Sequence, residues 1–526
     1  MGRAKVVKYY NGRWQGSLSE EDCDKLEQII ALNDVGGCFS DLRHVIYDLG
    51  ESATMQYIRE IETLGTSEVE KKVGTLTDLQ TLGVAFMFIA GNCILGDSVG
   101  LGKTIETAGL CSLLASVYKQ NNKDFHYLLL TEKNLVDQTR STMVRFTGEY
   151  AEMLTGDAKA VINFRNKHPF GAYLPMGVVG SHSLLTQNKF IEWFELCRSN
   201  SFNKAAPFDL LVVDESGVLG GLKSKITENA SILIPLFKRV IFLNATPFTS
   251  SLKTFYSQLN LLDSTMLPAK TNFDKEFIVF DYRGMYPRPT NKYKNTDTFR
   301  QKVGYRYFAR TRRENGAVME DCTGRVIISP LSSIQKAWLQ KTQMPQMVFD
   351  CPNALDATIP FNETNVPKLA SLREALEKDC EDADTILLYV HYTQAQDSIS
   401  EWLTANGYTN RVLSGKTKDS DRAEIIRGFK SGEYRVLVTN VQKGLNFGDC
   451  NYCIFYAFDP TPSSMVQFEG RITRSFDIVG KHIILLCSDG RELDRLNKVI
   501  RERAVASTRF TKSDLSCVMD LLLSED

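Results

Sequence analysis

The sequence predicts an α/β protein whose core is two doubly wound parallel sheets, each forming a lobe of its own. Short runs of Val, Ile and Leu alternate with polar, helix-like stretches over residues 79–263, and a second such series occupies residues 366–500. Runs of this kind, closed by small or acidic residues, are typical of buried parallel strands with helices on both faces. The length of 526 residues also exceeds what one hydrophobic core usually holds.

The expected strands can be read off in order. The first lobe has NCIL at 92–95, HYLLLT at 126–131, MGVVGS at 176–181, FDLLVVDES at 208–216 and RVIFLNATP at 239–247. The second lobe has DTILLYVHYT at 384–393, NRVLSG at 410–415, YRVLVTN at 434–440, YCIFYAF at 452–458 and KHIILLCS at 481–488.

Five regions follow from this pattern. We expect an N-terminal accessory region over 1–70, the first lobe over 71–263, a largely helical insertion or linker over 264–365, the second lobe over 366–500 and a helical tail over 501–526. The accessory region should contain an amphipathic helix near Ser19, where Ser19 and Asp22 fit a capping pattern.

Composition is that of an ordinary soluble chain. It has 62 basic and 63 acidic residues, so nucleic-acid binding would need a local basic surface. The only close pair among its 12 cysteines, Cys450 and Cys453, has no second pair at zinc-ligand spacing, and we interpret both as buried strand residues. The N-terminus lacks a signal-peptide run and no apolar stretch is long enough to span a bilayer. We expect an intracellular soluble protein, cytoplasmic in a bacterium or phage and nuclear in a eukaryote.

A glycine-rich turn in GDSVGLGKTIE follows the first expected strand and leads into a helix. Such a turn aims backbone N–H groups at phosphates, and Gly100 and Gly102 would let the backbone approach them. Lys103 would reach the β and γ phosphates and Thr104 would hold Mg²⁺. The strict phosphate-loop pattern has glycine where this chain has Asp97, so a chance glycine turn is the alternative.

Two carboxylates end the strand in FDLLVVDESG. Asp214 could hold Mg²⁺, and Glu215 could orient and deprotonate an attacking water. A strand ending in two solvated acids is the alternative, and the phosphate-binding turn upstream argues against it.

The segment QFEGRITR brings Gln467, Gly470, Arg471 and Arg474 together in the second lobe. On a helix, arginines three residues apart share a face, from which they could stabilise charge on a γ phosphate. ATP would then bind between the lobes, which is the arrangement of a motor.

Together these segments resemble the ordered motifs of superfamily-two helicases, and most closely the Swi/Snf-like branch of double-stranded DNA translocases. The resemblance spans about residues 75–500 and includes TDLQTLGVAFM, GDSVGLGKTIE, VVDESG, LNATPFTSSLKTFYSQLNLLD, LSGKTKDSDRAEIIRGFKSGEYRVLVTNVQKGLNF and QFEGRITR. The family also has Asp at the position of Asp97, and VGLGKTIE is similar to its bacterial RapA-like members. The resemblance implies two RecA-like lobes.

The resemblance also implies roles for single residues. Gln80 matches the glutamine that reads adenine, Thr246 matches the motif that couples hydrolysis to nucleic-acid grip, and Gly444 and Asn446 match a loop that senses both. Nucleic-acid contacts, mostly to phosphates, are implied for Lys133, Ser181, Ser414, Lys416 and Thr439. Ordinary polar loop residues are the alternative for each of these five.

Two departures bear on mechanism. Gly217 stands where the family usually has His, which removes a link towards the arginine motif, and TNVQKGLNF lacks the family's paired glycines. The cluster Tyr305–Arg313 could be a DNA-facing strut or a solvated linker.

The resulting expectation is a Mg²⁺- and ATP-dependent translocase on double-stranded DNA that remodels or displaces complexes, with a DNA-bound protein as a further candidate partner and without a membrane. A strand-separating or annealing helicase on forks or RNA, and an ATP-gated protein-interaction module with little turnover, are the alternatives.

Overall fold

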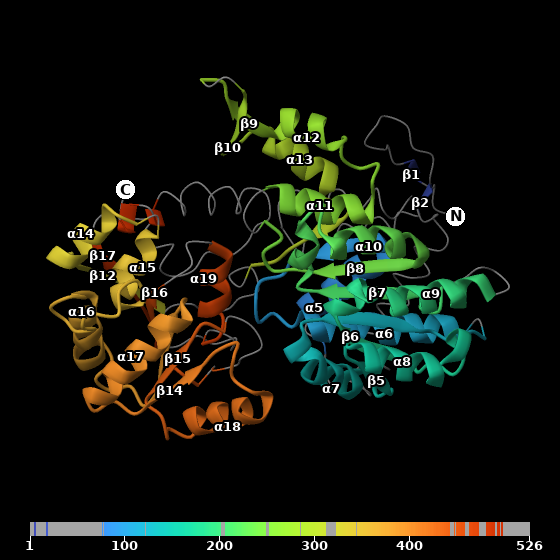
Figure 1. Cartoon of the computed structure of the whole chain (residues 1–526). Coiled ribbons are helices and arrows are strands. Elements are labelled where there is room, and N and C mark those ends of the chain that lie inside the picture. The colour runs from blue at the N-terminus through green and yellow to red at the C-terminus, as the bar shows by residue number, and fades with distance from the viewer. Residues whose placement is uncertain are drawn as a thin grey trace. The chain divides into compact units, whose positions relative to one another are not determined.

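The structure is a computed structural model. It describes the backbone of residues 5–6, 17–18, 76, 78–120, 122–200, 206–248, 252–283, 286–311, 322–342, 344–441, 447, 449–457, 462–472, 480–489, 492–494 and 496–497. The chain divides into two compact units whose boundary lies between Thr311 and Arg312. Each unit contains one parallel sheet, and the two are described separately (Figure 1).

The first unit is built on a seven-stranded sheet with the order β11-β3-β8-β7-β4-β6-β5, in which every neighbouring pair is parallel. Its strands are β3 (Asn92–Leu95), β4 (Tyr127–Thr131), β5 (Ala151–Leu154), β6 (Gly177–Ser181), β7 (Leu210–Asp214), β8 (Arg239–Leu243) and β11 (Tyr307–Phe308). The carboxyl ends of parallel strands lie at one edge of a sheet, where α/β proteins bind ligands.

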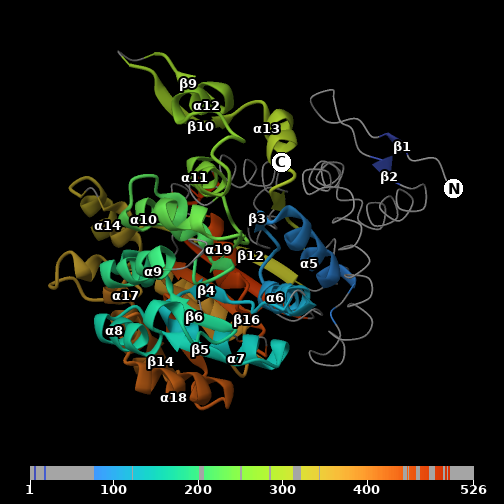
Figure 2. The same cartoon turned by 90° about the vertical axis from the view of Figure 1, so that its right-hand side faces the viewer.

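Helices cover the strands of the first unit. They are α5 (Asp78–Ala90), α6 (Lys103–Gln120), α7 (Val136–Thr147), α8 (Ala158–Lys167), α9 (Asn188–Asn200), α10 (Lys225–Leu233), α11 (Leu252–Leu262), α12 (Lys270–Phe277) and α13 (Thr296–Val303). A hairpin of β9 (Ile278–Asp281) and β10 (Arg288–Tyr293) lies with α12 and α13 beyond α11 (Figures 1 and 2).

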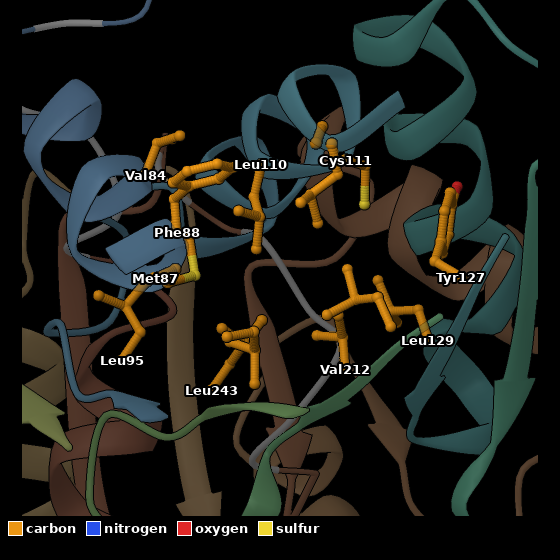
Figure 3. Packing of buried hydrophobic residues seen from close by; sticks show 14 of the residues in the cluster. Val84, Met87, Phe88, Leu95, Leu110, Cys111, Tyr127, Leu129, Val212 and Leu243 are labelled. Carbon is orange, nitrogen blue, oxygen red and sulfur yellow. The ribbon is translucent and has the colours of Figure 1, made fainter. Parts of the chain in front are cut away.

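One face of this sheet packs against α5, α6 and α7. Figure 3 shows Phe88 of α5 and Leu110 of α6 pointing towards Leu129, Val212 and Leu243 of the strands. The residues that alternate with these along the strands are buried too, so both faces are covered. Burying one such side chain stabilises the fold by about 1.5–3 kcal/mol.

The second unit is built on a six-stranded parallel sheet with the order β12-β17-β16-β13-β15-β14. Its strands are β12 (Cys322–Ser329), β13 (Ile386–Val390), β14 (Asn410–Leu413), β15 (Val436–Thr439), β16 (Tyr452–Ala457) and β17 (Lys481–Ser488). Its helices are α14 (Ser333–Leu339), α15 (Pro345–Asp350), α16 (Lys368–Glu374), α17 (Thr393–Ala405), α18 (Asp419–Lys430) and α19 (Pro462–Glu469).

Alternate residues of these strands enter two different cores. Leu388 and Ile454 pack with α16 and α17 on one face, and Leu387 and Phe455 pack with residues of α18 and α19 on the other. The second sheet is therefore doubly wound, as the sequence predicts.

All ten expected strand segments contain a strand of the structure, which confirms the two parallel-sheet lobes. The stretch 264–365 differs from the expectation because it is not largely helical. It contains β9, β10, β11 and β12, and β11 and β12 form the edges of the two sheets. β11 has only two residues, and in β12 Thr323, Arg325 and Ile328 are exposed while Ile327 and Ser329 are buried, so neither gives a continuous apolar run.

Few residues of the chain's ends are described. Lys5–Val6 (β1) pairs antiparallel with Ser17–Leu18 (β2), whereas the helix expected near Ser19 and the tail 501–526 lie outside the described residues. The five domain boundaries remain predictions. Cys450 and Cys453 are both buried, as expected, but only Cys453 lies in a strand, because β16 begins at Tyr452. None of the described helices is long and apolar enough to cross a membrane.

Candidate nucleotide and nucleic-acid sites

The candidate phosphate loop runs from the end of β3 to the start of α6. Gly100 and Gly102 have φ of 92° and 93°, a region that L-residues rarely adopt, so this loop shape depends on glycine. α6 begins at Lys103, and its first turn presents backbone N–H groups and the positive end of the helix dipole to the loop. The expected strand, turn and helix are thus present.

The loop is held by two side chains predicted to bind nucleotide. Lys103 Nζ donates to the carbonyl oxygens of Asp97 at 2.6 Å and Ser98 at 3.2 Å. Gln80 Nε2 donates to the carbonyl oxygen of Leu101 at 3.2 Å. Both side chains therefore lie at the loop, as their proposed roles require.

Asp97, where the strict pattern has glycine, forms a buried charge cluster with Arg310 and Glu106. The side chain of Arg310 is 2% exposed, and those of Asp97 and Glu106 are 0% exposed. Arg310 Nη2 forms ion pairs with both carboxylates. Arg310 Nε donates to Asp97 Oδ2 at 3.0 Å, and the Arg310 backbone N–H donates to Asp97 Oδ1 at 2.9 Å. Burial and the charge of Asp97 raise the pKa of Glu106 to about 8, against the effect of Arg310.

The segment Tyr305–Arg313 is expected from the sequence to be either a DNA-facing strut or a solvated linker, and the position of Arg310 fits neither. Tyr307 and Phe308 form β11, and Arg310 is neither DNA-facing nor solvated but buried against the phosphate loop. Backbone bonds extend the pairing of this segment along the loop, with Gly96 N–H donating to Phe308 O and Ser98 N–H donating to Arg310 O. Arg312 and Arg313 lie outside the described residues.

Asp214 and Glu215 lie at the carboxyl end of β7. Asp214 Oδ2 accepts a hydrogen bond from Thr131 Oγ1 at 3.1 Å. Loss of hydration and the charge of Glu215 raise the pKa of Asp214 to about 6, whereas Lys103 and Thr131 act in the opposite direction. β3, which leads into the loop, and β7 both pair in parallel with β8, so the loop and Asp214 lie at the same carboxyl edge of the sheet. Glu215 has φ 48° and ψ 49°, a left-handed conformation that costs a non-glycine residue energy.

Asn244 and Thr246 lie directly after the end of β8. The Thr246 backbone N–H donates to Asn244 Oδ1 at 3.0 Å, and Thr246 is 4% exposed. Its Oγ1 has no hydrogen-bond partner among the described residues.

In the second unit, the expectation that Arg471 lies on a helix is wrong. α19 ends at Glu469, and the Arg471 N–H donates to Phe468 O in a tighter turn. Gly470 explains the end of the helix, because glycine has a poor helix propensity. Gln467 is 7% exposed and Arg471 is 3% exposed. The other candidates Arg474, Gly444 and Asn446 lie outside the described residues.

The five candidate nucleic-acid contacts differ in exposure. Lys133, after β4, and Lys416, after β14, are exposed. Ser181 is buried and its Oγ accepts the Gly156 N–H at 3.0 Å, and Ser414 Oγ accepts the Lys416 N–H at 3.2 Å. Thr439 is 0% exposed and its Oγ1 donates to Leu413 O. The two lysines thus offer exposed charge, whereas the three hydroxyls shape their own loops.

Sequence reasoning missed three residues of these sites: Thr131, His182 and Arg310. Thr131 and His182 contact Asp214, His182 through a 2.7 Å bond between its Nε2 and the Asp214 carbonyl oxygen. A signal existed for Thr131, which ends a predicted strand. Arg310 lies 213 residues from Asp97, a separation that no local pattern bridges.

The residues fit ATP and Mg²⁺. Lys103 has only to exchange carbonyl oxygens for phosphate oxygens, which are stronger acceptors of a charged hydrogen bond. The carboxylate of Asp214 and the hydroxyl of Thr104, the residue after Lys103, would supply oxygen ligands of the kind that Mg²⁺ prefers.

A parallel-sheet lobe with a candidate phosphate loop and an acidic strand end, followed by a second parallel-sheet lobe, is the arrangement expected of a helicase-type ATPase. Comparison with protein families specifies the class further. The model of the SNF2-related domain matches residues 8–384, and that of the helicase conserved C-terminal domain matches residues 367–476. This chain belongs to the SNF2-related family.

Similar curated proteins are distant in sequence. A chromodomain-helicase-DNA-binding protein 1-like from Danio rerio is 23% identical over 458 residues, covering 80% of this chain and 41% of that protein. The SWI/SNF-related matrix-associated actin-dependent regulator of chromatin subfamily A-like protein 1 of Bos taurus is 24% identical over 485 residues, covering 86% of this chain and 47% of that protein. The chain thus spans about half the length of the curated relatives it matches.

A solved structure is also similar. The Sulfolobus solfataricus SWI2/SNF2 ATPase core in complex with dsDNA matches with a TM-score of 0.39 and 16% identity, covering 83% of this chain and 94% of that one.

Proposed function

We propose that this protein is a Mg²⁺- and ATP-dependent translocase that moves along double-stranded DNA and remodels or displaces complexes on it. The observation that carries the proposal is the placement of the loop that ends at Lys103 and of Asp214 at the same carboxyl edge of the first parallel sheet, in a chain of the SNF2-related family. The similarity to relatives such as a DNA repair and recombination protein of Gallus gallus supports DNA as the substrate.

The first unit binds the nucleotide in this proposal. The N–H groups of the loop at Gly100 and Gly102 and the side chain of Lys103 hold the phosphates, while Gln80 reads adenine. Thr104 and Asp214 hold Mg²⁺, which when bound neutralises charge on the β and γ phosphates.

Glu215 orients the attacking water and accepts its proton. Its left-handed backbone and its place directly after Asp214 set the direction of its carboxylate. Gln467, Arg471 and Arg474 of the second unit stabilise the charge that develops on the γ phosphate.

The exposed side chains of Lys133 and Lys416 bind DNA phosphates in this account, and Ser181, Ser414 and Thr439 shape the loops that present them. Phosphate contacts position a strand without reading sequence. Thr246, Gly444 and Asn446 couple this grip to hydrolysis. The protein would work in the compartment that holds the DNA, against a DNA-bound protein partner.

The test is the ATPase rate with no nucleic acid, single-stranded DNA, duplex DNA or duplex RNA, with Glu215→Gln as the blank. Strong stimulation by duplex DNA, weakened steeply by salt, supports the proposal. Preference for single strands, forks or RNA favours a helicase, and no stimulation by any of them favours a protein-interaction module.

A further inference from the structure

Gln258, on α11, uses the whole hydrogen-bonding capacity of its buried side chain. It is 0% exposed. Its Oε1 accepts from Ser216 Oγ at 2.7 Å and from Asn244 Nδ2 at 3.0 Å. Its Nε2 donates to the carbonyl oxygens of Pro247 at 3.2 Å and Thr254 at 3.1 Å. An amide has two acceptor and two donor positions, so all four are satisfied.

These bonds join two segments of the candidate site. Ser216 directly follows Glu215, and Asn244 in turn accepts the backbone N–H of Thr246. Ser216 and Asn244 are 0% and 2% exposed, so the network lies away from water, where hydrogen bonds are strong and unpaired polar groups are costly. A single side chain thus connects the segment that carries Glu215 with the segment that carries Thr246.

The Gln258 network adds to the bonds that hold the turn at Glu215, which include the Glu215 N–H donating to Asp214 Oδ1 at 3.0 Å. A left-handed non-glycine residue such as Glu215 persists only where its surroundings hold it. Ser216, the residue directly after Glu215, is anchored by the bond from its Oγ to Gln258 Oε1. A displacement of residues 244–247 would move Asn244 and the carbonyl of Pro247, and with them Gln258 and Ser216. Gly217 offers no side chain for another link.

We propose that Gln258 is a positioning residue that transmits the nucleic-acid-bound state of the Thr246 segment to Glu215. This inference rests on the proposed function, because it concerns the stimulation of ATP hydrolysis by DNA. Gln258 itself contacts neither substrate, and it acts by fixing the direction of the Glu215 carboxylate when the 244–247 turn is engaged.

The test compares Gln258→Leu and Ser216→Ala with the control Ser257→Ala. Leucine keeps the approximate volume but leaves Ser216, Asn244 and Pro247 without their bonds to the amide. Ser257 lies beside Gln258, is 1% exposed, and donates from its Oγ to Leu219 O at 2.7 Å, so the control removes a buried bond between α11 and the 216–220 segment without touching 244–247.

ATP turnover is measured on the full chain without DNA and with saturating duplex DNA, and folding is checked by thermal unfolding. We expect Gln258→Leu to lose about tenfold of the stimulation, within the usual range of coupling between sites, with basal turnover and the KM for ATP near those of the wild type. Ser216→Ala should lose part of the stimulation, and Ser257→Ala should keep it.

Full stimulation in folded Gln258→Leu, or an equal loss of basal and stimulated turnover, overturns the inference and leaves the proposed function intact. If Gln258→Leu does not fold, Ser216→Ala decides, and unchanged stimulation in that variant overturns the inference. A wild-type protein that no nucleic acid stimulates contradicts the proposed function, and this inference with it.

Discussion

Replacing Arg310 by Gln tests the role of the buried charge cluster at the phosphate loop. The substitution leaves Asp97, 0% exposed, without its charged partner, and Glu106 loses the same guanidinium. Breaking a buried ion pair from one side costs about 3–5 kcal/mol, a large part of a typical unfolding free energy of about 5–15 kcal/mol. For a unit of about 300 residues, whose unfolding entropy is roughly 2.1 cal/mol/K per residue, that corresponds to a fall in Tm of about 5–8 °C.

Arg306→Gln is the matched control. This neighbouring arginine also holds the backbone near β3, through the carbonyls of Ala90 and Asn92, but its side chain is 22% exposed. Its loss should cost only about 1 kcal/mol. Arg310→Lys keeps the charge without the two-pronged geometry and should lie between the two.

The assay is calorimetric unfolding together with hydrogen exchange of peptides from residues 92–120, which report on the first unit. Adding Asp97→Asn to Arg310→Gln should recover part of the lost stability, because the unpaired buried charge is then removed. A loss below about 1 kcal/mol in Arg310→Gln, or full additivity in the double variant, would refute the reasoning.

Three further predictions concern the two units. Lys103→Ala should weaken nucleotide binding about 10- to 100-fold by removing a charged hydrogen-bond donor, measured by titration with a fluorescent ADP; unchanged affinity would contradict its role. Glu215→Gln should lower kcat by about 10²- to 10⁴-fold while nucleotide binding persists, measured by phosphate release; a residual rate near that of the wild type would exclude it as the base. In the second unit, burial raises the pKa of Asp350 to about 7 although Lys368 opposes the shift. Because the folded pKa lies above the ordinary one, this group's contribution to stability is complete below about pH 3.8 and is lost as the pH rises through 7. Asp350→Asn should therefore flatten the dependence of the unfolding free energy on pH in that window, measured by urea titration, and an unchanged slope would count against it.

The sequence predicts those strands that are buried on both faces. All five residues of β4 and of β13 are buried, so their apolar runs are continuous and unambiguous. Three of the four edge strands, β5, β11 and β12, escape because they are short or half exposed, whereas the edge strand β14 is predicted. The helix expected at Arg471 is absent for a different reason. The three-residue spacing of Arg471 and Arg474 suits a helix, but α19 ends at Glu469, directly before Gly470.

The candidate site is predictable where its residues follow strands in sequence. Asp214 ends β7, Lys103 begins α6 after the loop that follows β3, and the parallel sheet brings the carboxyl ends of both strands to one edge. The partners of Asp97 and Ser216 are not predictable in this way, because Arg310 and Gln258 come from an edge strand's end and from a helix, and only tertiary packing places them. Arg310 and Gln258 are polar residue types that usually lie on the surface, so the sequence alone does not mark them as buried.

The central claim is movement along double-stranded DNA driven by ATP. A third strand bound to a duplex would be released by a protein that travels along the duplex, and its release can be followed by fluorescence. The account predicts ATP-dependent release by the wild type with the duplex strands still paired, and no release by Glu215→Gln. Stimulated ATP hydrolysis without release, or release accompanied by separation of the duplex strands, would contradict it.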